Sequence, residues 1–203
     1  MNIKHVVVTR LALKWRFNET KLNWDSWLKN SVELMDLFCR PSLRNQTNQN
    51  FMLLSLVDES VDYFGNILEN ETIIKVSSKN NEYPKQEMIQ KINNYLNEFD
   101  DVDAVILTRL DRDDCLHYKF LERVWEYLKD GDEKYVDLNY SLTYDLSKKI
   151  AYNSKKYYHT FVSPFVSTCE KIKKGNLRCI SLLVDHNHVP QHLNGKKVND
   201  LFA

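Results

Sequence analysis

Short apolar runs and amphipathic stretches alternate along residues 1–128, and this alternation restricts the chain to few folds. The strand-like runs are 5–9, 49–57, 72–76 and 104–107. The helix-like stretches, with apolar residues at helical spacing, are 24–39, 86–99 and 116–128. Because strands that alternate with helices pair through right-handed crossovers, the sequence predicts an α/β fold with a mostly parallel central sheet and helices on both faces.

The last third of the chain follows a different pattern. Residues 135–145 and 147–153 predict two antiparallel strands, and 180–184 predicts a final strand. The segment 161–173 fits either a loop or a short helix. Since no internal repeat or linker interrupts the chain, we expect a single domain over 1–203 with an irregular C-terminal third.

Composition excludes several classes of protein. Lys and Arg together number 28, as do Asp and Glu, so the net charge is zero and nucleic acid is not an expected partner. The four cysteines are widely spaced and form no CxxC pair, which argues against a zinc knuckle. We expect a reduced, cytoplasmic protein with four free thiols. The first apolar run is too short for a signal peptide or a membrane span, although peripheral membrane contact stays open, as does the oligomeric state.

Three aspartates follow the run at 104–107 almost at once. Asp111, Asp113 and Asp114 lie within four residues, and Arg109 precedes them. Carboxylates this close repel one another, and Mg²⁺ or Mn²⁺ commonly relieves the repulsion while substrate phosphate completes its shell. Because open α/β sheets bind ligands at the carboxyl ends of their strands, the cluster predicts a metal–diphosphate site. The alternative is a helix N-terminus, where Asp residues cap the first turn.

Other polar residues are expected at the same edge of the sheet. Thr9 and Arg10 end the first strand, and Arg109 belongs to an identical Thr-Arg dipeptide at the end of the fourth. Arginine forms forked hydrogen bonds with phosphate, so these residues are candidates for a nucleotide pocket, with a surface salt bridge as the alternative. Asp58 ends the second predicted strand and suits a ribose or a base, unless it is an ordinary turn aspartate.

Two further features are weaker candidates for functional residues. His186 and His188 lie in a stretch dense in metal-binding side chains, so either is a candidate ligand, although their i, i+2 spacing is not that of a zinc helix. Surface histidines in a loop are the alternative. Glu170 has apolar neighbours that would suit a general base, but a helix-surface glutamate explains it equally well.

Several of these segments together resemble the putative rhamnosyltransferase family of glycosyltransferases. The similarity rests on the first strand ending in Thr-Arg, on Phe38-Cys-Arg-Pro-Ser-Leu-Arg-Asn-Gln-Thr47, on Phe51-Met-Leu-Leu-Ser-Leu-Val-Asp58 and above all on Thr108-Arg-Leu-Asp-Arg-Asp-Asp114. It covers residues 5–128 well and the remainder loosely. The Cys-x-Pro-Ser and Thr-Arg-Leu-Asp-x-Asp-Asp motifs are specific as a pair.

The resemblance implies a glycosyltransferase-A fold that uses a nucleotide-sugar donor and a divalent metal, Mn²⁺ or Mg²⁺. Its DxD carboxylates would be Asp111 with Asp113 or Asp114, and a C-terminal histidine, His186 or His188, would complete the metal site. Glu170 would match an acceptor base, and Asp114 is a second candidate catalytic carboxylate. Residues 1–128 would bind the nucleotide sugar, and 129–203 would bind a glycan, lipid-linked or protein acceptor.

Sugar transfer is therefore the predicted activity, and two other functions stay open. The first is a degenerate transferase that binds a nucleotide or a glycan without catalysis. The second is a sugar nucleotidyltransferase, which is disfavoured because no glycine-rich loop follows the first strand: the residues there are Leu11-Ala-Leu-Lys-Trp-Arg-Phe17.

Overall fold

The computed structural model describes residues 1–14, 23–77, 83–138, 142–145, 147–153, 165–173 and 176–198. Its strands are β1 (Ile3–Ala12), β2 (Met52–Asp58), β3 (Glu71–Val76), β4 (Ala104–Leu110), β5 (Lys134–Leu138), β6 (Leu142–Asp145), β7 (Ile150–Asn153), β8 (Ser167–Lys171) and β9 (Asn194–Val198). Its helical elements are α1 (Trp24–Leu34), the π-helical turn η2 (Met35–Cys39), α2 (Arg40–Arg44), α3 (Lys85–Leu96), α4 (Phe120–Leu128), α6 (Ile180–Leu183) and the 3-10 helix η4 (His186–Gln191).

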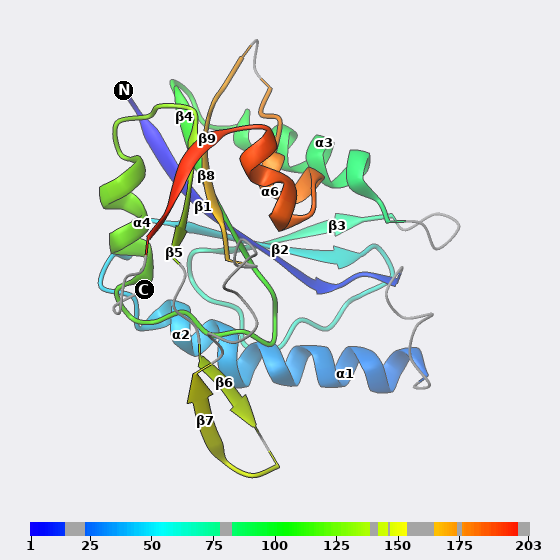
Figure 1. Cartoon of the computed structure of the whole chain (residues 1–203). Helices are drawn as coiled ribbons and strands as arrows, with labels where there is room; N and C mark the ends of the chain where they lie inside the picture. The colour runs from blue at the N-terminus through cyan, green and yellow to red at the C-terminus, as the bar shows by residue number, and fades with distance from the viewer. Residues whose placement is uncertain are drawn as a thin grey trace.

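Seven strands form the central sheet, in the order β3-β2-β1-β4-β8-β5-β9 (Figure 1). β1, β2, β3 and β4 are mutually parallel, and β5 is parallel to β9, whereas β8 runs antiparallel to both β4 and β5. The mostly parallel α/β sheet predicted from the alternating pattern is thereby confirmed. The carboxyl ends of β1, β2, β3 and β4 meet along one side, which we call the carboxyl edge.

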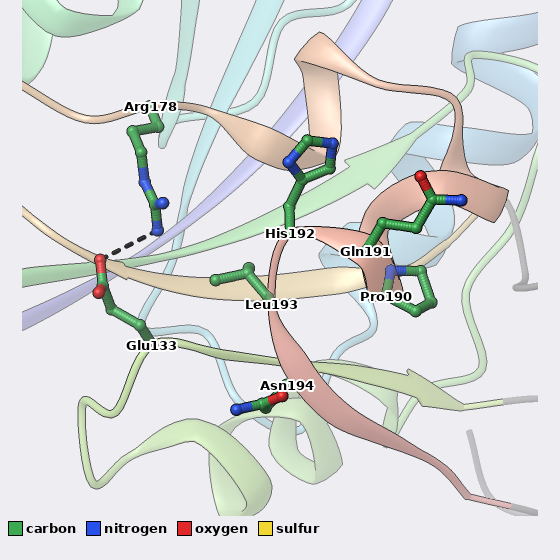
Figure 2. A pocket seen from close by; sticks show the side chains of 7 residues that line it. All are labelled: Glu133, Arg178, Pro190, Gln191, His192, Leu193 and Asn194. Carbon is green, nitrogen blue, oxygen red and sulfur yellow. Dashed lines mark hydrogen bonds and ion pairs between the residues drawn. The ribbon is translucent and has the colours of Figure 1, made fainter.

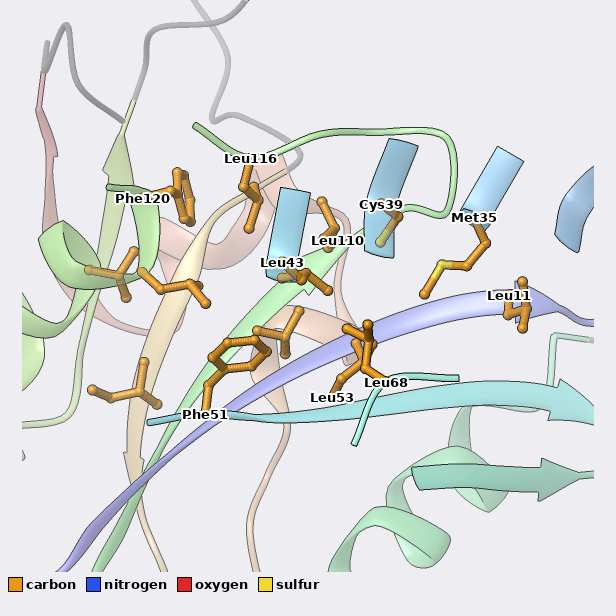
Figure 3. Close-up of a cluster of buried hydrophobic side chains, with 14 of the residues drawn as sticks. Leu11, Met35, Cys39, Leu43, Phe51, Leu53, Leu68, Leu110, Leu116 and Phe120 are labelled. Carbon is orange, nitrogen blue, oxygen red and sulfur yellow. The ribbon is translucent and has the colours of Figure 1, made fainter. Parts of the chain in front are cut away.

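Helices cover both faces of this sheet. On one face, Leu11, Leu53 and Leu110 of the strands belong to one buried cluster with Leu43 of α2 and Phe120 of α4 (Figure 3). On the other face, the strands pack against α3 and α6. Because successive strand residues alternate between faces, a strand buried on both sides reads as a nearly continuous apolar run, as in Val6–Val8 of β1, Met52–Val57 of β2, which Ser55 interrupts, and Ala104–Leu107 of β4.

The first helical stretch is longer than the predicted 24–39. Asn23 caps α1, because its side-chain oxygen accepts a hydrogen bond from the Ser26 backbone N–H at 2.8 Å. The chain then passes through the π-helical turn η2 into α2 and stays helical to Arg44, across Pro41. Pro41 falls in the first turn of α2, directly after the π-helical turn, where the Arg40 N–H bonds to Met35 O and the regular α-helical hydrogen-bond pattern is already interrupted.

The predictions for the C-terminal third need several corrections. Residues 180–184 were expected to form a strand, but Ile180–Leu183 is a helical turn packed on α3 and β4. The segment 161–173 contains the strand β8 rather than a loop or helix, while 161–164 lie outside the described residues. A short apolar run does not by itself distinguish a strand from a helix, so tertiary packing decides.

Two other boundaries move for similar reasons. The predicted strand 135–145 divides into β5, within the central sheet, and β6, which pairs antiparallel with β7 in a separate hairpin (Figure 1). The predicted helix 116–128 begins only at Phe120, because hydrogen bonds to α2 hold the preceding residues in a loop. In the described part of the chain, no helix is long and apolar enough to cross a membrane.

A buried histidine makes the stability of this fold depend on pH. His5 is 2% exposed, and its Nε2 lies 2.9 Å from Thr108 Oγ1, which in turn lies 2.7 Å from Ser167 Oγ. Desolvation lowers the pKa of His5 to about 3, so the folded chain keeps the imidazole neutral. The unfolded chain takes up a proton near pH 6.5, and the stability that His5 contributes is therefore complete above pH 6.5 and lost as the pH falls toward 3.

We expect a His5→Gln variant to have a flatter stability profile in acid than the wild-type chain. One proton taken up on unfolding corresponds to about 1.4 kcal/mol per pH unit, so His5 should account for about 2 kcal/mol of the loss between pH 6 and 4.5. Urea unfolding of both chains across this pH range gives their free energies of unfolding. The difference between the two is free of the titration of the carboxylates, because both chains contain the same ones. Parallel profiles would contradict the assigned protonation state.

Candidate functional site

The ends of β1 and β4 bring two arginines to one aspartate. The strands are parallel neighbours, with Val8 opposite Arg109 and Thr9 opposite Leu110, so Arg10 and Asp111 emerge at the same level of the carboxyl edge. Arg10 Nη2 donates to Asp111 Oδ1 at 2.6 Å, and Arg109 Nη2 lies 3.7 Å from Asp111 Oδ2. Asp111 therefore lies between two guanidinium groups.

Both members of the Arg10–Asp111 pair are largely shielded from water. Their side chains are 10% and 21% exposed. Burial alone would lower the pKa of Arg10, but the charge of Asp111, the nearby Tyr83 and the hydrogen bonds to both raise it above its usual value. The guanidinium thus stays charged at any physiological pH, and the low local dielectric strengthens its attraction for an anion.

Asp113 and Asp114 occupy the loop that follows β4. Asp113 is exposed, whereas Asp114 is partly buried and its backbone N–H donates to Asp111 O at 3.1 Å. Burial, together with the charges of Asp113 and Asp111, raises the pKa of Asp114 to about 7, and Arg109 opposes the shift. Because α4 begins only at Phe120 and is preceded by Lys119 at its N-cap, the helix-capping explanation of the three aspartates is wrong.

The donor set of this loop suits a divalent cation that is shared with a ligand. Its three aspartates offer carboxylate oxygens, the atoms that Mg²⁺ and Mn²⁺ prefer, and their mutual repulsion is what such a cation relieves. Within the described ranges, no three His, Cys, Asp or Glu side chains form a group that would hold a metal by themselves. Magnesium is typically held by one or two carboxylates plus substrate phosphates, so the residues fit an open site of that kind.

Asp58 lies at the end of β2, on the same edge, and behaves largely as a turn aspartate. Its Oδ1 accepts hydrogen bonds from the Ser60 backbone N–H at 3.1 Å and from Ser60 Oγ at 2.6 Å, and lies 3.4 Å from Lys14 Nζ. Thr9 is fully buried, and its Oγ1 has no hydrogen-bond partner among the described residues. Since strand residues alternate in direction, the Thr9 side chain points to the opposite face from Arg10.

Glu170 is not near the aspartate loop. It lies on β8 opposite Val105, close to the amino end of β4, and because β4 continues to Leu110 the two sites are roughly 20 Å apart. Its side chain is completely buried: Oε1 accepts from the Ile180 backbone N–H at 2.8 Å, and Oε2 lies 3.9 Å from Arg178 Nε. Burial raises the pKa of Glu170, and its completely buried carboxylate lies toward the opposite end of β4 from Asp111. This geometry does not support a role as acceptor base, which stays a prediction.

The two candidate histidines belong to η4, on the face of the sheet that α3 and α6 cover (Figure 1). His188 is exposed, and it joins no metal-binding group with the aspartates in the described part of the chain. The position of His186 along the backbone is described, but not its side chain. A ligand role for either histidine therefore stays a prediction.

A polar cavity of about 240 Å³ lies far from the aspartates, at the amino edge of the sheet. Arg178, Glu133 and His192 line it, and Arg178 Nη2 donates to Glu133 Oε1 at 3.1 Å (Figure 2). Since Asn194 begins β9 and Lys134 begins β5, this cavity opens at the end of the sheet opposite to Asp111. The cavity is therefore separate from the cluster around Asp111.

Sequence reasoning missed the residues that hold the aspartate loop. Arg112, between Asp111 and Asp113, places its guanidinium carbon 5.0 Å from the ring centre of Trp27 on α1. Ser42 and Gln46, at and after α2, form hydrogen bonds with the backbone of residues 116–121. The only signal in the sequence was that the segment containing Ser42 and Gln46 occurs with the Asp motif in one family.

The open α/β sheet and the polar cluster at its carboxyl edge define a Rossmann-like protein with a candidate ligand site. The sequence model of a family described as "Putative rhamnosyl transferase" matches residues 17–200, and the chain belongs to this family. The name of the family indicates a glycosyltransferase. No curated protein matches the chain.

Proposed function

We propose that the chain is a metal-dependent glycosyltransferase that moves a sugar from a nucleotide-diphosphate donor to a hydroxyl acceptor. One observation carries the proposal: Arg10, Arg109 and Asp111 converge at the carboxyl edge in a member of the rhamnosyl transferase family, and two further aspartates follow in the same loop. Forked guanidinium groups suit phosphate oxygens, and carboxylates suit Mg²⁺ or Mn²⁺, so this cluster has the chemistry of a metal–diphosphate site.

Each residue of the cluster has a distinct role in this proposal. Arg10 and Arg109 bind the donor phosphates, and Asp111 with Asp113 or Asp114 holds the Mn²⁺ or Mg²⁺ ion. The pairing of Arg10 with Asp111 keeps both groups charged and aligned before the donor arrives. When bound, the cation stabilises the negative charge that develops on the leaving diphosphate.

The nucleoside would extend from the phosphates toward Asp58, because β2 lies beside β1 and ends at the same edge. Thr9 is fully buried and points to the opposite face of the sheet from Arg10, so it makes no direct contact with the donor in this proposal. Asp114 is the remaining candidate catalytic carboxylate, as it shares the loop of Asp111. Glu170 has no part in this mechanism.

We further propose a glycosyltransferase-A architecture, with residues 1–128 as the nucleotide-sugar half and 129–203 as the acceptor half. In support, the parallel strands β1, β2 and β4 and all the candidate donor-binding residues lie within 1–128. The acceptor, whether a glycan, a lipid-linked sugar or a protein hydroxyl, would be bound by the remainder of the chain.

Calorimetric titration with UDP, GDP and dTDP, each with and without Mn²⁺, tests the donor site. We expect one nucleotide to bind tightly only with Mn²⁺, and Asp113→Asn to weaken that binding at least tenfold because a ligand carboxylate is lost. Asp132→Asn is the matched control, since Asp132 is also exposed but precedes β5 at the amino edge. If none of the three nucleotides binds the wild-type chain, the proposal is wrong; if one binds but its sugar is never transferred, the chain is a non-catalytic binding module.

A further inference from the structure

The segment 39–49, which carries the Cys-Arg-Pro-Ser motif, lies beside the aspartate loop but contributes no group to the proposed donor site. Its second residue is anchored in the core. Arg40 is 1% exposed and binds both carboxylate oxygens of Glu71, through Nε and Nη2, each at 2.8 Å. Because Glu71 begins β3, this bidentate pair ties the start of α2 to the sheet.

From this anchored base, two side chains reach the loop that follows the aspartates. Ser42 Oγ accepts a hydrogen bond from the Leu116 backbone N–H at 3.2 Å. Gln46 is 4% exposed; its Oε1 accepts from the Leu121 N–H at 3.0 Å, and its Nε2 donates to His117 O at 2.9 Å. In Figure 3 the loop passes over α2, with Leu116 beside Leu43.

The loop is thus held at both of its ends. At the first end, Arg10 binds Asp111 at 2.6 Å, and at the second, Ser42 and Gln46 bind the backbone from Leu116 onward. Only four residues, including Asp113 and Asp114, lie between these two anchors. Such a short span between fixed ends keeps mutually repelling carboxylates together, and a ligand then binds without first having to order the loop.

We propose that Ser42 and Gln46 are positioning residues that hold the carboxylates of the Asp111–Asp114 loop in the arrangement required by a divalent cation and a diphosphate. This role rests on the proposed function, and it explains why the Cys-Arg-Pro-Ser segment accompanies the Asp motif. Neither side chain contacts the ligand; each acts through the loop backbone. Residues of this kind, which orient metal ligands, typically change metal affinity or activity 10–100-fold when they are removed.

Gln46→Met and Ser42→Ala test the proposal, and the chain offers close controls for both. Gln49 is also a glutamine of this segment, and its Nε2 donates to Leu43 O, Arg44 O and Gln46 O without reaching the loop, so Gln49→Ala is the control for Gln46→Met. Ser42→Thr keeps the hydroxyl and should restore the function that Ser42→Ala loses. Ser42→Ala also serves if Gln46→Met does not fold.

Two measurements on each variant separate this proposal from the donor-site proposal. The first is hydrogen exchange at the amides of Leu116 and Leu121, which needs no ligand; the second is Mn²⁺-dependent binding of UDP, GDP and dTDP. We expect Gln46→Met and Ser42→Ala to exchange faster and to bind about tenfold more weakly, while Gln49→Ala and Ser42→Thr match the wild-type chain.

If hydrogen exchange is unchanged in Gln46→Met and Ser42→Ala, Ser42 and Gln46 do not hold the loop, and the proposal is overturned whatever the wild-type chain binds. Faster exchange with unchanged binding would reduce both residues to a structural role and also overturn the proposal. If the two variants exchange faster but the wild-type chain binds none of the nucleotides, the donor-site proposal is overturned. The ordering of the loop by Ser42 and Gln46 would then still be supported.

Discussion

An Asp113→Asn variant is expected to lose at least a hundredfold in sugar transfer while unfolding at the same urea concentration as the wild-type chain. Asp113 is exposed, so its carboxylate has little part in folding. The substitution keeps the size of the side chain but removes the negative charge that would hold Mn²⁺ or Mg²⁺. Asp111 is a less informative position, because it also pairs with Arg10 at 2.6 Å and its replacement would disturb the site as well.

The loss is measured as the initial rate of transfer from a nucleotide sugar, whose nucleotide is the one that binds in calorimetry. The control variant Asp132→Asn should retain the wild-type rate. Removing the metal with EDTA should abolish transfer by the wild-type chain, because the carboxylates without their cation cannot stabilise the leaving diphosphate. Adding Mn²⁺ should restore transfer. Wild-type rates in Asp113→Asn, or rates unaffected by EDTA, would remove this aspartate and the cation from the mechanism.

Replacement of Arg40 by methionine is expected to lower the free energy of unfolding by about 3–5 kcal/mol, because it leaves the buried carboxylate of Glu71 without its counter-charge. The Glu71 side chain is 0% exposed and the Arg40 side chain 1%. Burial alone would lower the pKa of Arg40, but hydrogen bonds and charges from Glu71 and Asp36 raise it above its usual value, so the buried guanidinium stays charged.

The double variant Arg40→Met, Glu71→Gln should recover much of this loss, because the uncompensated charge is gone while the glutamine oxygen still accepts from Ser55 Oγ, which lies 2.6 Å from Glu71 Oε1. Urea unfolding of the two single variants and the double variant gives the coupling energy. Lys75→Met is the control: Lys75 pairs with Asp62 at the same 2.8 Å, but on the surface, so its loss should cost less than about 1 kcal/mol. Equal losses at the two sites would mean that burial does not determine the strength of the Arg40 pair.

The surroundings of this pair leave little room for adjustment. Gly65 has a φ of +73°, and a Cβ atom there would lie 2.5 Å from Asp36 Oδ2 and 3.0 Å from Arg40 Nη1. Only glycine combines that backbone conformation with so close an approach. The anchor of α2 therefore depends on residues from three separate segments of the chain, and only one of them carries the family motif.

The alternation of apolar runs and amphipathic stretches was enough to predict the parallel half of the sheet and to bring Arg10, Arg109 and Asp111 to one of its edges. Strands such as β1 and β4, buried on both faces, leave unbroken apolar runs that end in polar residues, and parallel strands bring those ends to one edge. Arg10, Arg109 and Asp111 could therefore be placed together before the register was known. These inferences succeed because burial and strand direction are recorded in the local pattern.

The other features depend on contacts between segments that are distant in the sequence. Residues 180–183 form a helical turn that packs on α3 and β4. Glu170 lies at the far end of β4 from Asp111 because β8 enters the sheet antiparallel to β4. The clamp of Ser42 and Gln46 on the aspartate loop joins residues more than 70 positions apart. Such contacts depend on which segments meet in space, and a polar side chain has the same sequence signature whether it faces water or a buried backbone group.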